Sequence, residues 1–283
     1  MGPMEIQSVC VCGAGTMGSG IAQVAAAAGL PVVLYELNEA VLEKAKSGIA
    51  KNLQTAVEKG KLDAAAAGAA LGRIRFTSAI DDCVADLVVE AIIEKMEAKT
   101  TLFRQLAERN GATTIFASNT SSLSIAALAD TLPHPERVAG LHFFNPAPLM
   151  KLVEVVQGPR TDAGTIDALL AFTKAVGKTP VLCTDAPGFI VNRVARPYYI
   201  ESLRLAEEGL PFDTIDRLLE AQGFKMGPFK LMDLIGNDVN YAVSCSVYAQ
   251  MGNPGRLRPS DIQKERVDSG NLGRKTGKGY YEY

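Results

Sequence analysis

The chain has 283 residues, with 29 lysines and arginines against 31 aspartates and glutamates, which gives a net charge of −2. At about 150 residues per domain, this length favours two domains. The small net charge excludes a global field that would capture nucleic acid or an anionic membrane, so any anionic ligand must be held by a local site. The sequence contains no run of about 20 apolar residues, so we expect no membrane helix. It does not begin with a basic segment followed by an apolar one, so we expect no secretory signal. Residues 1–3, which precede a second methionine, are compatible with an expression remnant.

The two histidines restrict the chemistry that this chain can perform. A zinc site built from several histidines is nearly excluded, because only His134 and His142 are present. His134 lies between prolines and is expected in a surface loop. His142 is therefore the only good candidate for catalysis by an imidazole.

The five cysteines indicate a reducing compartment, and we expect a cytoplasmic protein. Cys10 and Cys12 are two residues apart and share one face of an expected strand, which does not allow an ordinary disulfide. Cys83, Cys183 and Cys245 are isolated in the sequence, and no spacing typical of metal ligands occurs. We therefore predict no metal site and interpret these cysteines as small buried side chains.

Strands and helices alternate along the first part of the chain. Apolar runs predict strands at 8–12, 31–37, 74–76, 86–93, 113–118 and 138–144. Helical patterns lie between them, at 21–28, 39–59, 63–70 and 95–109 and from residue 124 onward. This alternation predicts βαβ units and an α/β fold, with a doubly wound, mostly parallel, Rossmann-like sheet.

One connection breaks this alternation. Only about seven residues, including Pro146 and Pro148, separate the strand that ends near Phe144 from the apolar run 152–156. A parallel crossover needs about a dozen residues or more, so the second strand should return antiparallel. This places Glu154 near His142. A helix at 163–176 and a strand at 180–184 follow.

The pattern becomes entirely helical after residue 187. Helices are expected at 189–208, kinked at Pro197, and at 213–222, 231–250 and 259–269, with a last strand at 280–283. We therefore predict two domains, a dinucleotide-binding domain at 1–187 and a helical domain at 188–283.

A glycine-rich loop predicts the cofactor. The first strand runs directly into Gly13-Ala14-Gly15-Thr16-Met17-Gly18, a GxGxxG motif that also opens a helix. In this context Gly13 permits the tight turn, Gly15 lets the backbone approach a pyrophosphate, and Gly18 allows close packing of helix and strand. The acidic Glu36 ends the second strand and would accept hydrogen bonds from ribose hydroxyls while repelling a 2′-phosphate. NAD is therefore favoured over NADP.

Three polar groups should meet at one edge of the sheet. The segment 118–122 follows one parallel strand, His142 lies near the end of the next, and Glu154 lies near the start of the antiparallel strand. Ligands of open α/β sheets bind outside the carboxyl ends of the strands. These groups are thus expected beside the nicotinamide.

Several segments, in order along the whole chain, resemble signatures of the L-3-hydroxyacyl-CoA dehydrogenase family. They are Ser118-Asn119-Thr120-Ser121-Ser122-Leu123, His142-Phe143-Phe144-Asn145-Pro146, residues 152–156, residues 188–193, Met226-Gly227-Pro228-Phe229, residues 233–236 and residues 273–277. The length resembles that of the single-function, short-chain members, including bacterial 3-hydroxybutyryl-CoA dehydrogenases. It leaves no room for a fused hydratase module.

The resemblance implies an acid–base mechanism on an acyl-CoA substrate. His142 would remove the proton of the 3-hydroxyl, and Glu154 would orient the imidazole and stabilise its cation. Ser121 would hydrogen-bond the substrate 3-oxygen, and Asn192 would hold the substrate and the catalytic groups. The resemblance also assigns cofactor contacts to Glu94, Lys99, Asn119, Ser121 and Lys275.

The resemblance also bears on CoA binding and on assembly. In the family, basic residues of the region 39–59 approach CoA; here they are Lys44, Lys46, Lys51 and Lys59. We take Lys51 as the substrate contact, although an exposed helix face explains all four equally well. Family members pair through the helical domain, so a homodimer is expected.

Each proposed site residue also has a purely structural interpretation. His142 could pack at a strand end, Glu154 could pair with Lys151, and Ser121 could only cap a helix. Asn192 could be a buried helix residue. Glu94 and Lys99 could form an exposed pair at a helix start, and Lys275 could belong to a solvated terminus.

Two other functions remain open at this point. A β-hydroxyacid or 6-phosphogluconate type dehydrogenase would share the glycine loop and the helical domain, but its chemistry centres on a lysine. A non-catalytic dinucleotide-binding protein could lose His142, Glu154 or Ser121 without unfolding, yet all three are present.

Overall fold

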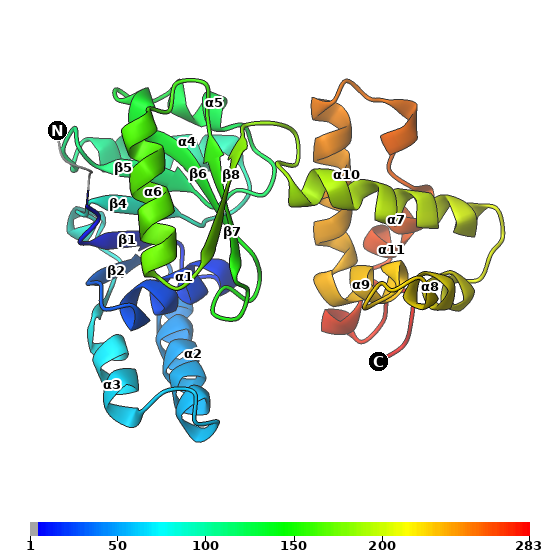
Figure 1. The fold of residues 1–283 in the computed structure, drawn as a ribbon, viewed down its shortest axis with the longest axis horizontal. Coiled ribbons are helices and arrows are strands. Elements are labelled where there is room, and N and C mark those ends of the chain that lie inside the picture. The colour runs from blue at the N-terminus through cyan, green and yellow to red at the C-terminus, as the bar shows by residue number, and fades with distance from the viewer. Residues whose placement is uncertain (1–4) are drawn as a thin grey trace. The chain divides into compact units, whose positions relative to one another are not determined.

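The computed structural model describes residues 5–283 (Figure 1), so the suspected remnant at 1–3 lies outside the described residues. The chain divides into two compact units, one that extends to Asp185 and one from Ala186 to Tyr283. Within residues 5–283, no helix is both long enough and apolar enough to cross a membrane.

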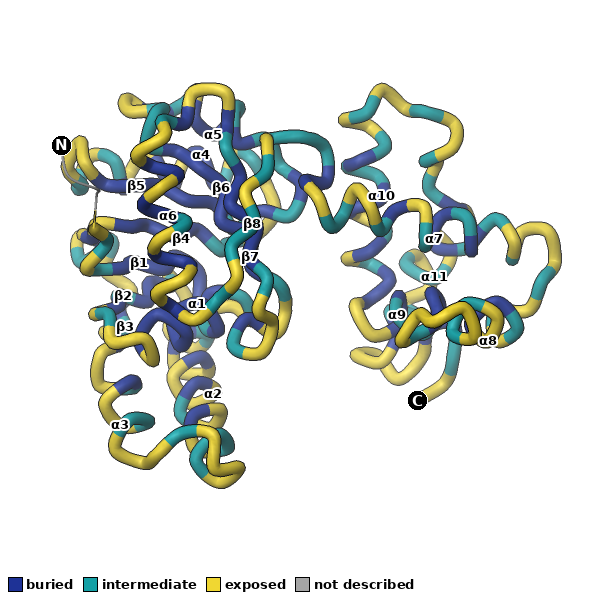
Figure 2. Tube along the Cα trace, in the orientation of Figure 1, coloured by how far each residue is buried: buried dark blue, intermediate teal, exposed yellow. Residues whose placement is uncertain are grey.

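The first unit is built on an eight-stranded sheet of order β3-β2-β1-β4-β5-β6-β7-β8. Its first five strands are short, apolar and mutually parallel, and most of their residues are buried (dark blue in Figure 2), as expected for a sheet that is covered on both faces. The strands are β1 (Val9–Cys12), β2 (Val32–Tyr35), β3 (Ile74–Thr77), β4 (Leu87–Glu90), β5 (Ile115–Ser118), β6 (Val138–Phe143), β7 (Leu152–Gln157) and β8 (Thr179–Thr184).

Helices cover both faces of this sheet. Val9 and Val11 of β1 belong to a core that includes residues of the first, second and sixth helices. On the opposite face, Phe103 packs edge-on against Phe116 of β5, with ring centroids 5.4 Å apart. The helices are α1 (Thr16–Ala27), α2 (Glu39–Glu58), α3 (Ala64–Gly72), α4 (Met96–Ala107), α5 (Ile125–Ala129) and α6 (Ala163–Ala175). The predicted doubly wound, mostly parallel sheet is confirmed.

The connection after β6 reverses the chain direction, as predicted. Strands β6 and β7 pair antiparallel, and their register places His142 directly opposite Glu154. Strand β8 then runs parallel to β7 at the edge of the sheet. Side chains directly opposite each other on neighbouring strands point to the same face, so this register by itself brings the imidazole and the carboxylate together.

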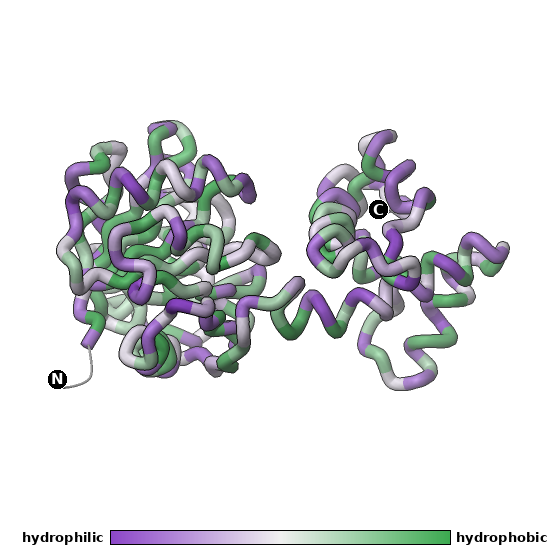
Figure 3. The backbone as a smooth tube through the Cα atoms, turned by 90° about the horizontal axis from the view of Figure 1, so that it is seen from above, coloured by the Kyte–Doolittle hydropathy of each residue, from purple (hydrophilic) through white to green (hydrophobic). Residues whose placement is uncertain are grey.

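The second unit is helical. Its helices are α7 (Val191–Glu207), which contains Pro197, α8 (Phe212–Ala221), α9 (Pro228–Ile235), α10 (Asn237–Gln250) and α11 (Asp261–Asp268). In both units hydrophobic and hydrophilic residues intermingle along the chain (Figure 3).

Two sequence predictions for this unit are wrong. The expected single helix 231–250 is interrupted at Gly236, whose φ of 105° belongs to a region that favours glycine, so α9 ends there and α10 begins. The expected strand at 280–283 is not formed, because Tyr280 and Tyr281 donate their backbone N–H groups to the carboxylate of Asp233 instead. Only isolated bridges occur there, from Lys278 to Gly273 and to Glu282.

Asp233 holds the C-terminal segment in place. It is 1% exposed and also accepts hydrogen bonds from the Tyr283 hydroxyl and from the Asn237 side chain. A Cβ on Gly279 would lie 2.0 Å from an oxygen of this carboxylate. Gly279 therefore allows close packing around this buried acid.

Candidate active site

The predicted site residues of the first unit follow the carboxyl ends of neighbouring strands. Gly13 follows β1, Glu36 follows β2, Glu94 follows β4 by four residues, and Asn119 follows β5. His142 is the penultimate residue of β6. Because β1, β2, β4, β5 and β6 run parallel, these residues lie along one edge of the sheet, where ligands of such folds bind.

The glycine loop has the form of a dinucleotide cradle. Gly13 has a φ of +100°, and a Cβ there would lie 2.7 Å from the Ala91 carbonyl oxygen. A Cβ on Gly18 would lie 1.8 Å from the carbonyl oxygen of Gly13, whereas around Gly15 nothing lies within 4 Å. Two glycines are thus required by packing. Gly15 instead leaves open space at the first backbone N–H groups of α1. The roles that the motif predicts for the three glycines therefore fit a bound pyrophosphate.

The start of α1 also suits an anion. Its N-cap is Gly15, which offers no side chain to accept from the first N–H groups, and the next two residues are Thr16 and Met17. Helix α2, by contrast, is capped by the Asn38 side chain, which accepts from two backbone N–H groups. The unfilled donors of α1 and its helix dipole favour a negatively charged group at this end.

Glu36 is connected to the glycine loop. One carboxylate oxygen accepts the backbone N–H of Ala14 at 3.0 Å, and the other accepts the N–H of Asn38 at 3.1 Å. The side chain is half-buried. A carboxylate held in this position presents negative charge next to the loop, and that charge disfavours an additional phosphate.

His142 and Glu154 form a buried pair. The Nδ1 atom of His142 lies 2.7 Å from Oε2 of Glu154, and the two residues are 5% and 1% exposed. Shielding from water strengthens the interaction between an imidazole and a carboxylate at this distance. His142 is thus a partner of Glu154 within the sheet.

A second buried ion pair supports the loop after β5. Lys99 is 1% exposed, and its Nζ lies 2.6 Å from Glu90 and 3.1 Å from Glu94. Glu94 in turn accepts the Thr120 hydroxyl and the backbone N–H of Ser121. Glu94 and Lys99 do pair, and Glu94 is exposed, but Lys99 is buried, so the pair is not a purely exposed one. The ammonium group of Lys99 fixes two acids, and one of them positions the loop that carries Ser121.

Sequence reasoning missed Glu90, the other acid of this network. It is fully buried and accepts hydrogen bonds from Lys99, from the Ser118 hydroxyl at 2.6 Å and from the backbone N–H of Ile92. Burial raises the pKa of Glu90, while Lys99 and these hydrogen bonds act in the opposite direction. An acid at the end of the apolar run Leu87–Glu90 was a visible signal, because a buried carboxylate requires a partner.

Asn119 connects the ends of β5 and β6. Its Oδ1 accepts the backbone N–H of Phe143 at 2.8 Å. This contact fixes the backbone of the residue next to His142. Ser121, two residues further along the chain, does not cap α5, because Ser124 is the residue that caps that helix.

The two remaining candidates, Asn192 and Lys275, belong to the second unit. Asn192 lies in the first turn of α7, and its carbonyl accepts Nε of Arg196. Lys275 forms an ion pair with Asp238, with an N–O distance of 2.7 Å to one carboxylate oxygen. This pair is partly exposed, so it adds little to stability.

A cavity of about 970 Å³ lies beside the glycine loop within the first unit. Its walls come from α1, α2, the loop after β6 and the turn before β8, and its lysines are Lys44, Lys59, Lys61 and Lys178. Lys51 does not line it, and Lys46 lies over the Phe76 ring instead. Half-buried Lys178, which was not predicted, donates to the carbonyls of Ala147, Pro148 and Met150 and so fixes the loop after β6.

Comparisons with known proteins agree with this geometry. The family described as 3-hydroxyacyl-CoA dehydrogenase, NAD binding domain, matches residues 8–186, and the corresponding C-terminal domain family matches residues 188–283. The chain is 49% identical to 3-hydroxyadipyl-CoA dehydrogenase from Escherichia coli over 99% of its own length, but it spans only 60% of that relative. It is 41% identical to a probable 3-hydroxybutyryl-CoA dehydrogenase from Deinococcus radiodurans, with 96% of this chain and 99% of the relative covered.

A solved structure shows the same architecture over the full length. The (S)-3-hydroxybutyryl-CoA dehydrogenase from Ralstonia eutropha superimposes with a TM-score of 0.94 at 38% identity, and 99% of each chain is covered. Family matches to nearly every residue, together with a sheet edge that carries the glycine loop and the buried histidine, leave one assignment: the chain belongs to the 3-hydroxyacyl-CoA dehydrogenase family.

Proposed function

We propose that this protein interconverts (S)-3-hydroxyacyl-CoA and 3-ketoacyl-CoA with NAD as the redox cofactor. The observation that carries the proposal is the buried pair of His142 and Glu154, 2.7 Å apart, on the same sheet edge as the glycine loop. Such a pair can take up and return one proton next to a bound dinucleotide, which is the proton chemistry that oxidation of an alcohol requires.

In the proposed mechanism, the imidazole of His142 accepts the proton of the substrate 3-hydroxyl at Nε2. Glu154 engages Nδ1, holds the ring in one orientation and stabilises the imidazolium that forms. NAD bound at the glycine loop supplies the acceptor for the hydride that leaves C3. In the reverse direction, the imidazolium returns its proton to the 3-oxygen as that oxygen gains negative charge.

Further residues position the reactants in this proposal. Ser121 hydrogen-bonds the substrate 3-oxygen, and Asn192 holds the substrate and the catalytic groups. Glu94, Lys99, Asn119 and Lys275 are assigned to the cofactor. Support for the role of Ser121 comes from Lys99, which contacts Glu94, and from Glu94, which accepts the backbone N–H of Ser121.

The cavity beside the glycine loop is the proposed site for the phosphates of CoA. Lys44 of α2 and Lys59, which follows the last residue of this helix, line the cavity, and they replace Lys51 as our candidates for CoA contacts. Because these lysines are exposed, each contact should contribute about 1 kcal/mol or less and should weaken at high salt. Alanine at either position should therefore raise the KM for the CoA substrate by up to about fivefold. Lys51→Ala is the matched control on the same helix and should leave KM unchanged.

We further propose a short-chain substrate, 3-hydroxybutyryl-CoA, on the basis of the relatives with that name. A dicarboxylic substrate such as 3-hydroxyadipyl-CoA is the alternative, since the Escherichia coli relative is named for it. Initial rates with acetoacetyl-CoA, a longer 3-ketoacyl-CoA and 3-oxoadipyl-CoA distinguish these possibilities.

We assign residues 1–187 to NAD binding and residues 188–283 to the substrate cleft and to a homodimer interface. Apolar side chains exposed on the helices of the second unit support the dimer, among them Val194, Leu218 and Leu234, which are 72%, 57% and 49% exposed. All five cysteines are free thiols, which supports a cytoplasmic location. Sedimentation analysis of the purified protein tests the dimer.

The decisive experiment is an NADH oxidation assay with acetoacetyl-CoA, repeated with NADPH. We expect turnover with NADH and a much lower kcat/KM with NADPH, because Glu36 places negative charge next to the loop. Folded protein that turns over no 3-ketoacyl-CoA would overturn the proposed activity. Equal use of NADPH would overturn only the role of Glu36.

A further inference from the structure

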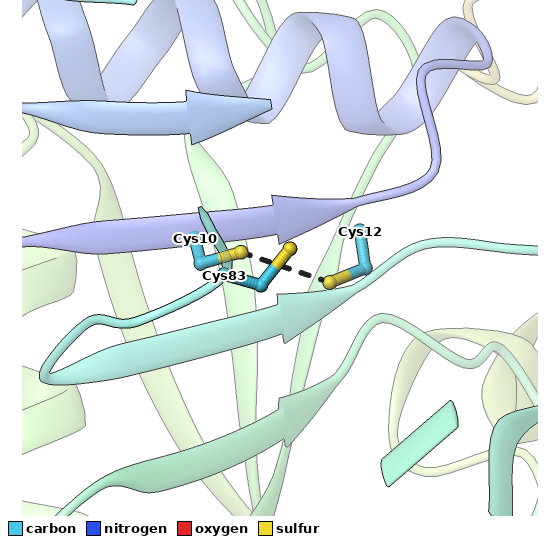
Figure 4. A group of neighbouring side chains, drawn as sticks. All are labelled: Cys10, Cys12 and Cys83. Carbon is cyan, nitrogen blue, oxygen red and sulfur yellow. Dashed lines mark hydrogen bonds between the residues drawn. The ribbon is translucent and has the colours of Figure 1, made fainter. Parts of the chain in front are cut away.

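The face of the sheet that α4 covers contains a cluster of three thiols that the proposed reaction does not use. Cys10 and Cys12 project from β1, and Cys83 comes from the turn that follows the short 3-10 helix Ile80–Asp82 (Figure 4). The sulfur atoms of Cys10 and Cys12 are 3.8 Å apart, and all three sulfurs lie within 4.8 Å of one another. The sequence showed Cys83 as isolated, but the fold places it against the other two.

We propose that Cys10, Cys12 and Cys83 form a binding site for one thiophilic metal ion, with Cu⁺ as the ion that fits best. This inference is independent of the proposed dehydrogenase activity, because none of the three side chains belongs to the candidate active site.

The spacing of the sulfur atoms supports the proposal. A metal–sulfur bond is about 2.3 Å long, so three sulfurs arranged in a triangle around one metal lie about 4.0 Å apart. The observed separations, 3.8 Å for one pair and at most 4.8 Å for the others, require sulfur displacements of only a few tenths of an ångström. A shift of this size is within reach of side-chain rotation alone.

The type and number of ligands select the metal. Among the described residues, the cluster brings together three cysteines and no histidine, aspartate or glutamate. Thiolates prefer soft ions such as Cu⁺ and Zn²⁺. A structural Zn²⁺ almost always takes four ligands, and all three cysteines are 0% exposed, which disfavours water as the fourth. Cu⁺ is stable with three sulfur ligands, so it suits a dry site of three thiols.

The third ligand is held ready and lies close to the surface. The backbone carbonyl of Cys83 accepts Nδ2 of Asn110 at 2.8 Å, and its N–H donates to Ile80 at 3.0 Å. Its neighbours are accessible, since Val84 is 58% exposed. The turn that carries Cys83 therefore reaches the surface, and we take this turn as the route by which an ion enters the site.

The test is an anaerobic titration of the fully reduced, full-length protein with Cu⁺ in competition with bicinchoninate. We expect one tightly bound Cu⁺ per chain, and Zn²⁺ should compete poorly for the site. Loss of an outer-shell partner already costs about 10- to 100-fold in metal affinity, so removal of a direct ligand in Cys83→Ala or Cys12→Ala should cost at least about 100-fold. Cys183→Ala and Cys245→Ala are the matched controls, since neither residue belongs to the cluster, and both should bind like wild type.

Several outcomes would overturn the proposal. They are less than one tightly bound Cu⁺ per chain, unchanged affinity in Cys83→Ala, loss of binding in a control variant, or equally tight binding of Zn²⁺. X-ray absorption of the copper-loaded wild-type protein provides a test that does not depend on how the variants fold. It should show three sulfurs at about 2.3 Å, and oxygen or nitrogen ligands would also contradict the site.

Discussion

The substitution Glu154→Gln tests the proposed acid–base pair most directly. Glutamine keeps the size of the side chain and an oxygen that can accept from Nδ1 of His142, but it removes the negative charge that lies 2.7 Å from the ring. Two opposite charges about 4 Å apart interact by about 4 kcal/mol at an effective dielectric constant of about 20, and a hydrogen bond to a charged group contributes about 1.5–3 kcal/mol. A loss of 3–4 kcal/mol in the transition state lowers kcat by about 10²- to 10³-fold.

The assay measures kcat and KM for acetoacetyl-CoA reduction, together with NADH binding by fluorescence. We expect kcat to fall while the Kd of NADH stays unchanged, because the charge acts on the imidazolium formed during turnover. The chain contains its own control, since the Nδ1 atom of His134 lies 3.2 Å from Glu136 on the surface, where the side chains are 47% and 43% exposed. Glu136→Gln should have no effect on kcat. If Glu154→Gln retained more than a third of the wild-type kcat, the assigned role of this carboxylate would be wrong.

Three further predictions concern the cofactor loop, the buried ion pair and the C-terminal segment. Gly15→Ala should keep the thermal stability of wild type, because a Cβ there meets only open space. It should weaken NADH binding at least tenfold, because the pyrophosphate is expected to approach the backbone at this position. Gly13→Ala should instead lower Tm, because its Cβ would lie 2.7 Å from a backbone oxygen, and equal effects of both variants in calorimetry and NADH titration would refute this distinction. Lys99→Met leaves the buried Glu90 carboxylate unpaired and should cost about 3–5 kcal/mol in urea unfolding at pH 8. Burial raises the folded-state pKa of Glu90, so the neutral, protonated acid is favoured at low pH, and the destabilisation by Lys99→Met should be smaller at pH 5.5 than at pH 8. Adding Glu90→Gln to Lys99→Met should recover most of the lost free energy of unfolding. Asp233→Ala should lower the free energy of unfolding by roughly 3 kcal/mol, because it removes a buried charged acceptor of four hydrogen bonds, and unchanged chemical denaturation would contradict the anchoring role of this acid.

The sequence predicted those features that depend on neighbouring residues. Short apolar runs bounded by glycine define β1 and β2, because buried strands need apolar residues on both faces. The pairing of His142 with Glu154 was also predictable, because a connection of a few residues cannot cross over a sheet. The antiparallel return that it enforces leaves little freedom in the register of the two strands.

The features that sequence reasoning missed depend on contacts between distant segments. Lys99 is buried against Glu90, which ends a fully buried strand on another element, so the local helical pattern of α4 does not show that this lysine is buried. The absence of the strand at 280–283 results from the hydrogen bonds of the terminal segment to Asp233, which lies 47 residues before Tyr280. Cys83 reaches the cysteines of β1 from a turn more than 70 residues away. No local periodicity reports such contacts.

The candidate site combines a rigid part with a dependent part. His142 and Glu154 lie on adjacent strands, so the sheet itself determines their separation. Ser121 lies in a loop, and its position depends on a chain of contacts that runs from Glu90 through Lys99 and Glu94 to its backbone N–H. A loop position needs this support because a displacement of about 1 Å at a reacting group can cost about 100-fold in rate. The buried pair of Glu90 and Lys99 therefore holds Ser121 in its loop, so that this residue is positioned nearly as firmly as a residue of a strand.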